Sequence, residues 1–209
     1  MSPARPRVEG ERESEILDAA LDLLCRVGYD RLTMDAVAAE ARASKATLYR
    51  RWSTKSSLVV DAVLSTKEGL QVPAVDTGNL RDDLVQMSCG HGGLSDVRSG
   101  DIMAAMVTAL HRDPAFAEEF RARVVQPKTD ASRVVFERAR ARGEITADLD
   151  LDLLVPALAA IVLHRGFVLG LPADDKTVAQ VVDEIILPAA TRPTTTSTPT
   201  STPTDQEAR

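Results

Sequence analysis

A run of basic residues lies near the N-terminus with no acidic residue inside it. Between Glu40 and Asp61 the charged residues are Arg42, Lys45, Arg50, Arg51 and Lys55. Lysine and arginine donate hydrogen bonds to phosphate oxygens, and arginine also pairs with the O6 and N7 atoms of guanine. A solvated helix face is the ordinary explanation of such a run. A single sign of charge beside apolar helices nevertheless favours a polyanionic partner.

Two short helices joined by a turn are predicted to carry this basic run. Thr33 is a good N-cap for the first helix, and Ser44 caps the second, which extends over residues 45–52 with Leu48 turned inward. Helices this short are marginal alone, so a preceding helix that ends at Gly28 must complete their core. A pair of short helices whose second member is basic is typical of a helix-turn-helix.

The chain is predicted to divide into two helical domains between two unstructured ends. A flexible arm is expected at residues 1–9, a helix-turn-helix domain at 10–67, and a helical regulatory domain at 78–189. Ser53 or Thr54 would cap the fourth helix of the first domain, and Pro73 and Gly78 mark the boundary. Residues 190–209 are rich in Thr, Ser and Pro, which predicts a disordered tail.

The regulatory domain is expected to be built from helices with clear start and stop signals. Asn79 caps its first helix, and Asp113 caps a long helix that continues toward Gly143 with a bend at Pro127. One further helix is predicted over residues 150–169. The apolar residues of the last helix end at Pro188, which is predicted to end the helix.

Composition favours an all-α protein and disfavours other classes. Aromatic residues make up 3% of the chain, and the net charge of −6 argues against a surface that binds nucleic acid everywhere. The two cysteines, Cys25 and Cys89, are too few for a disulfide framework, and Cys89 with His91 lacks the ligand count of a metal site. Arg165 interrupts the most apolar span, which disfavours a membrane helix. We expect a cytoplasmic protein without catalytic residues, metal or cofactor.

The stretch Ala41-Arg-Ala-Ser-Lys-Ala-Thr-Leu-Tyr-Arg-Arg-Trp-Ser-Thr-Lys55, preceded by Leu32-Thr-Met-Asp-Ala-Val-Ala, resembles the signature of tetracycline-repressor-type (TetR family) regulators. The resemblance covers residues 11–64. It implies an all-α fold with an N-terminal three-helix helix-turn-helix domain and a C-terminal helical domain for ligand binding and dimerisation. Arg42 departs from the family, which often has glycine in this turn. With a positive φ it would be slightly strained and close to phosphate.

The resemblance also assigns roles to residues of the second short helix. Lys45 and Ala46 would reach base edges, and Arg50 lies one turn further along the same face. The residues expected to contact phosphates are Ser44, Thr47, Tyr49, Arg51 and Lys55, and the cap Thr33 is also expected in the DNA-binding site. A core position is the alternative for Tyr49 and the preferred interpretation for Trp52. For Arg51 a solvated charge remains the alternative.

Two sets of residues in the second domain are weaker candidates. An adaptable apolar pocket would be lined by Met87, Met103, Met106, Phe116, Phe120 and Phe136, although such stripes are more often plain core. A dimer seam formed by the last two long helices would contain Arg165, Val178, Val182, Ile185 and Ile186, because those helices are too apolar to leave exposed.

The expected function is a homodimeric DNA-binding regulator, a repressor that a small-molecule effector releases from a palindromic operator. A ligand-independent repressor and a helical adaptor that binds an acidic protein are the alternatives. An enzyme is disfavoured because the chain lacks a phosphate loop, a metal cluster and a nucleophile elbow.

Overall fold

The computed structural model describes residues 9–66, 75–89, 94–95 and 97–192, and every regular element within these ranges is a helix. The all-α prediction is confirmed. Residues 1–8 of the predicted arm, most of the predicted tail, part of the boundary segment and His91 lie outside the described residues, and Glu9, the last residue of the predicted arm, begins the first helix. No helix of the described ranges combines the length and apolarity that crossing a membrane requires.

The N-terminal helices begin and end at the residues that their caps indicate. They are α1 (Glu9–Val27), α2 (Met34–Glu40), α3 (Lys45–Arg51) and α4 (Lys55–Ser65). Thr33, Ser44 and Thr54 each accept a hydrogen bond from a backbone N–H in the first turn of their helix, as predicted. Gly28 ends α1 with a φ of 77°, a conformation that glycine adopts without steric cost.

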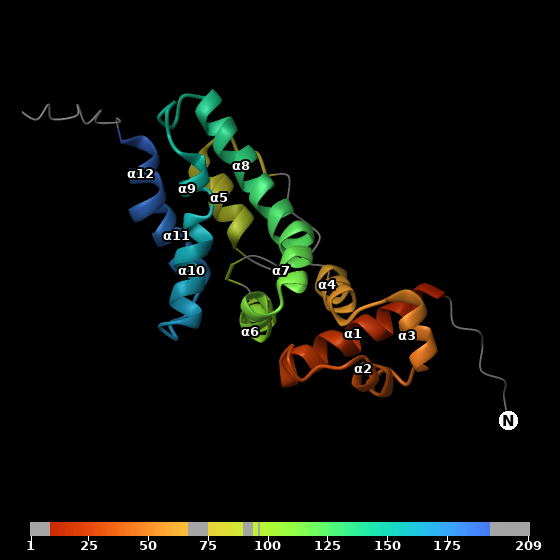
Figure 1. Ribbon diagram of the computed structural model, residues 1–209. Helices are drawn as coiled ribbons and strands as arrows, with labels where there is room; N and C mark the ends of the chain where they lie inside the picture. The colour runs from red at the N-terminus through yellow and green to blue at the C-terminus, as the bar shows by residue number, and fades with distance from the viewer. Residues whose placement is uncertain (1–8, 67–74, 90–93, 96, 193–209) are drawn as a thin grey trace, which may run out of the picture.

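The remaining helices form the larger part of the chain. They are α5 (Leu80–Ser88), α6 (Val97–Arg112), α7 (Pro114–Phe120), α8 (Gln126–Ala141), α9 (Leu151–Leu154), α10 (Ala157–Phe167), α11 (Asp175–Val181) and α12 (Leu187–Thr191). Asn79 caps α5 and Asp113 caps α7 as predicted. Figure 1 shows α1–α4 at one end, α9–α12 at the other, and the rod of α7 and α8 between them.

Two prolines lie inside continuous helices: Pro127, where a bend was expected, and Pro188, where the helix was expected to end. A π-helical segment, η1 (Arg121–Val125), precedes Pro127, and another, η2 (Val182–Ile186), precedes Pro188. Proline lacks an N–H and its ring clashes with the carbonyl four residues earlier, and a π turn removes that carbonyl from the α-helical register. The prediction that Pro188 ends the last helix is therefore wrong, since the helix continues to Thr191.

The single helix predicted over residues 150–169 is two helices in the structure. Asp150 caps the one-turn α9, and Pro156 then starts α10 as its N-cap residue. Because Pro156 has no N–H to donate to an earlier carbonyl, the helix breaks there and restarts with Ala160 N–H donating to the Pro156 carbonyl at 2.9 Å.

Two apolar cores divide the molecule, and the division does not follow the order of the sequence. The first core joins α1–α4 to α6 and α7 through buried residues such as Leu24, Leu58, Met106 and Phe116. The second joins α5 and α8 to α9–α12. Helices α6 and α7, which follow α5 in the chain, therefore pack against α1 and α4 of the N-terminal domain.

Candidate DNA-binding site

The helix-turn-helix consists of α2, a turn at residues 41–44, and α3. Thr33 Oγ1 accepts from Ala36 N–H at 3.1 Å, and Ser44 Oγ accepts from Thr47 N–H at 3.1 Å. Leu48 is the buried residue of α3. Because a helix of seven residues with one buried side chain leaves most of its surface open, α3 presents its other residues outward.

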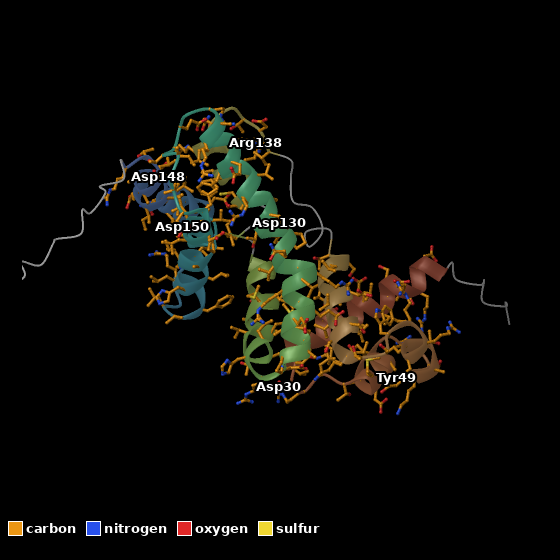
Figure 2. All side chains as sticks on the ribbon, turned by 45° about the horizontal axis from the view of Figure 1, so that its top comes forward. Asp30, Tyr49, Asp130, Arg138, Asp148 and Asp150 are labelled. Carbon is orange, nitrogen blue, oxygen red and sulfur yellow. The ribbon has the colours of Figure 1, made fainter. Side chains whose placement is uncertain are left out.

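Four residues of this outer surface belong to the predicted contact set. Lys45, Ala46, Tyr49 and Arg50 are all exposed, with 54% of Tyr49 accessible. Figure 2 labels Tyr49 at the end of the molecule formed by the N-terminal helices. Arg50 makes no hydrogen bond or ion pair with any residue that the structure describes. Its guanidinium is therefore available to an external acceptor.

Two other cations of the contact set are held by carboxylates of the chain itself. Lys45 Nζ lies 2.6 Å from Asp35 Oδ2, and Arg51 donates to Glu13 Oε1 at 2.9 Å. The hydrogen bond and charge of Asp35 raise the pKa of Lys45. Both pairs are largely exposed, so each contributes little to stability and water or phosphate can replace it.

Trp52 is a core residue, as expected. It is 2% exposed, and its Nε1 donates to Asp61 Oδ2 at 2.7 Å, which satisfies the indole N–H. Asp61 also accepts from Arg123 of η1 at 2.6 Å. Trp52 therefore fixes the end of α3 against α4 instead of reaching outward.

Lys55 is more enclosed than the other predicted phosphate contacts. Its ammonium donates to the Tyr29 carbonyl at 3.0 Å and lies 4.0 Å from the centroid of the Tyr29 ring. A cation over an aromatic face is attracted by the ring quadrupole. Lys55 thus opens α4 with its charge fixed by the turn that follows α1.

Tyr29 connects the helix-turn-helix to α6 and α7, and sequence reasoning missed it. Its N–H donates to Ala105 O at 3.2 Å, and its hydroxyl donates to Asp113 Oδ2 at 3.1 Å. Since that bond uses the hydroxyl proton, Ser56 of α4 donates to the Tyr29 oxygen at 3.1 Å. Burial raises the pKa of Tyr29 to about 12, so the hydroxyl stays protonated near neutral pH. Its partner Asp113 lies 84 residues away, and no local pattern signals that pairing.

Arg42 in the turn has a φ of 51°, the conformation considered for it from the sequence. Among the described residues other than glycine, no other residue has a positive φ. Left-handed backbone brings Cβ close to the following carbonyl oxygen, which is why glycine is usual at such positions. Arg42 itself is exposed.

The residues considered for a ligand pocket fall into the two separate cores. Met106, Phe116 and Phe120 are at most 1% exposed in the first core, where Met103 packs at the edge. Phe136 is buried in the second core, and Met87 packs against it. A crevice of about 350 Å³ lies elsewhere, between α6 and the turn that contains Tyr29 and Asp30. Figure 2 labels Asp30, which is one of the residues that line this crevice.

The residues considered for a dimer seam differ in their exposure. Val178, Val182 and Ile186 are each 0% exposed, because they form part of the chain's own second core. Ile185 is 46% exposed, and the Nε of Arg165 is buried without a hydrogen-bond partner among the described residues. Further exposed apolar side chains on α9, at the end of α10 and just after it are Leu153, Phe167, Val168, Leu169 and Leu171.

Comparisons with known proteins match both halves of the chain. Residues 16–62 match the bacterial regulatory proteins of the tetR family, and residues 74–185 match the tetracyclin repressor-like C-terminal domain. The HTH-type transcriptional regulator Rv1556 of Mycobacterium tuberculosis is 37% identical over 195 residues, which cover 92% of this chain and 94% of that protein. The DNA-binding transcriptional repressor TetR of Mycobacteroides abscessus is 33% identical over 84% of this chain and 92% of its own length.

A solved structure extends the similarity to the fold. The crystal structure of the TetR family transcription regulator SCO0332 matches with a TM-score of 0.64 at 28% identity, covering 87% of this chain and 100% of that chain. Sequence signature, family models, relatives and fold agree. The chain belongs to the TetR family and is a DNA-binding transcriptional regulator.

Proposed function

We propose that this regulator is a homodimeric repressor that binds a palindromic operator and is released by a small molecule. The observation that carries the proposal is the uncovered face of α3, where Lys45, Ala46, Tyr49 and Arg50 are exposed beside the turn. A recognition helix must present such a face to enter the major groove.

Base recognition is assigned to the side chains at the start and along the open face of α3. Arg50 has no partner among the described residues, so no internal bond must break before it pairs with guanine O6 and N7. Lys45 can donate to the same acceptors after it leaves Asp35. Ala46 offers a methyl group that can contact thymine.

Phosphate binding is assigned to the donors around the base-reading residues. The hydroxyls of Thr33, Ser44, Thr47 and Tyr49 and the cations of Arg51 and Lys55 form this set. Ser44 and Thr47 already share a hydrogen bond of 2.8 Å between their hydroxyl oxygens. That bond holds both groups at the first turn of α3, where a phosphate can replace it as a partner.

Dimerisation is assigned to the exposed apolar side chains at the end of α10 and on η2. Val168 is 68% exposed, Leu169 54% and Ile185 46%. Exposed apolar residues on α10 and η2, two segments of the same core, favour burial by a second copy. The unpaired Nε of Arg165 supports the same assignment, because a buried donor gains most when a partner supplies an acceptor.

Release by an effector rests on the contacts between α6, α7 and α4. A ligand that prefers one arrangement of α6 can shift α4 through Tyr29, and only such a preference changes operator affinity. The dense packing of Met106, Phe116 and Phe120 favours the alternative, a repressor that needs no ligand.

Selection of bound duplexes from random DNA tests the proposal. The wild-type chain should enrich a palindrome and protect two half-sites in footprinting, because a two-fold dimer places two α3 helices on one face of DNA. Arg50→Ala should weaken binding by roughly 1 to 3 kcal/mol per half-site and relax one base position. An unchanged sequence preference in this variant would remove Arg50 from the base-reading set.

A further inference from the structure

The turn between α2 and α3 closes with a pattern of hydrogen bonds that normally requires glycine. Ala43 N–H donates to Ala38 O at 2.8 Å, and Arg42 N–H donates to Ala39 O at 3.1 Å. These two bonds form a Schellman motif, in which the residue at the position of Arg42 is left-handed and is usually glycine. The chain therefore places a large charged residue where a residue without a side chain fits best.

A second arginine holds this turn from outside. Arg12 of α1 donates from its NH2 group to the Arg42 carbonyl at 2.6 Å, across 30 residues of sequence. Arg12 also pairs with Glu15 one turn along α1. The backbone of Arg42 is thus fixed on both sides, by the end of α2 and by α1.

The Arg42 guanidinium has no carboxylate partner among the residues that the structure describes. Within residues 33–52, Lys45 is paired with Asp35 and Arg51 with Glu13, whereas Arg42 and Arg50 are without such a pair. Arg42 is also exposed. It stands two residues before Ser44, which is assigned to phosphate, and three before Lys45, which is assigned to a base.

We propose that Arg42 binds a phosphate of the DNA backbone next to the recognition helix. Strained residues persist where surrounding structure holds them, and they concentrate at functional sites. Arginine at this left-handed position costs some strain, but it places a positive charge at the edge of α3 that glycine could not supply. The Arg12 bond holds the backbone of the turn in position. The proposal rests on the DNA-binding mode proposed above.

The test separates the charge of Arg42 from its backbone conformation. Arg42→Gly and Arg42→Asn both remove the charge with residues that tolerate the left-handed region, and Arg42→Lys keeps the charge. Lys176→Ala, on α11 at the other end of the molecule, is the control for net charge. The probe is the duplex that the wild-type chain selects from random DNA, titrated from 50 to 200 mM salt.

The uncharged variants should fold with melting temperatures no lower than the wild type, because neither has to hold a long side chain in left-handed backbone. Their plots of log affinity against log salt should flatten by about 1.8, from two lost phosphate contacts per dimer. The ratio of wild-type affinity to variant affinity for the duplex should then shrink by about 12-fold between 50 and 200 mM salt. Arg42→Lys and Lys176→Ala should keep the wild-type slope.

A wild-type slope in both Arg42→Gly and Arg42→Asn would overturn the proposal, whatever their affinity, since a purely structural role of the turn leaves the number of phosphate contacts unchanged. Failure of the wild-type chain to select any duplex would instead overturn the proposed operator binding itself.

Discussion

The Lys55 ammonium lies 4.0 Å from the centre of the Tyr29 ring and donates to the carbonyl of the same residue at 3.0 Å. Tyr29 also bonds α6 through Ala105 and the start of α7 through Asp113. One residue therefore holds both a cation assigned to DNA and the helices that follow the boundary. A movement of α6 that displaces Tyr29 would displace Lys55 as well.

Substitutions at Tyr29 and Lys55 should separate stability from DNA binding. Tyr29→Phe keeps the ring but removes the donor to Asp113 Oδ2, while Phe116 N–H still donates to Oδ1, so the free energy of unfolding in urea titrations should fall by about 1 to 3 kcal/mol. Its salt slope in DNA binding should match the wild type, because the ring and carbonyl still hold Lys55. Lys55→Met keeps most of the aliphatic packing and should flatten the salt slope by about 1.8 per dimer. A flattened slope in Tyr29→Phe would show that the hydroxyl positions Lys55.

Asp35 should act as an internal competitor of DNA for Lys45. Asp35→Asn frees the Lys45 ammonium and removes a negative charge near phosphate, so operator binding should tighten roughly 2- to 25-fold per dimer. Fluorescence anisotropy at fixed salt measures the change. Asp130→Asn is the matched control, because Asp130 lies on α8 in the middle of the molecule and not on α2 or α3 (Figure 2), and its change of charge is the same. Equal gains in both variants would attribute the effect to net charge alone.

Asp83 should contribute stability that depends on pH. Burial alone would raise the pKa of Asp83, but hydrogen bonds from Thr77 and the nearby Arg138 and Arg142 outweigh burial and lower the pKa. A carboxylate with a lowered folded-state pKa stabilises the protein above its unfolded pKa of about 3.9, and this contribution is lost as pH falls through the folded value.

Asp83→Asn should therefore be less stable than the wild type at pH 7 and lose less stability on acidification. Urea unfolding at a series of pH values compares the two chains. Asp83 is fully buried and Arg142 NH2 lies 3.5 Å from its Oδ2, so the neutral amide removes the buried one of the three carboxylates that pair with this guanidinium, the others being Asp76 and Glu144. Parallel curves of stability against pH would exclude Asp83 as the titrating group.

Two valines should respond differently to an acidic substitution. Val168→Asp, at a site that is 68% exposed, should leave the fold intact and produce monomers in sedimentation velocity. Val182→Asp, at a fully buried site, should unfold the chain because a charge in an apolar core has no partner. Val107→Asp on α6 is exposed to 51% and should remain dimeric. A dimeric Val168→Asp would place the interface on another surface.

Local features of the sequence determined the helix starts and the position of the basic helix. Thr33, Ser44, Thr54, Asn79 and Asp113 cap the helices predicted for them, because an N-cap bond joins residues two or three positions apart. The same holds for the exposed face of α3, which follows from helical periodicity around Leu48. Local rules were insufficient at Pro188, where a π turn carried the helix past the proline.

The tertiary structure alone decided which apolar faces are covered and which distant residues meet. An apolar stripe shows that a face needs burial, but Val182 faces the chain's own core whereas Ile185, three residues later, is exposed. The Tyr29–Asp113 bond spans 84 residues, so it exists only once α6 and α7 pack on α1 and α4. The periodicity of apolar residues does not indicate which helices will pack together, because any complementary apolar surface can bury a given face. It therefore could not indicate that Asp113 would meet Tyr29.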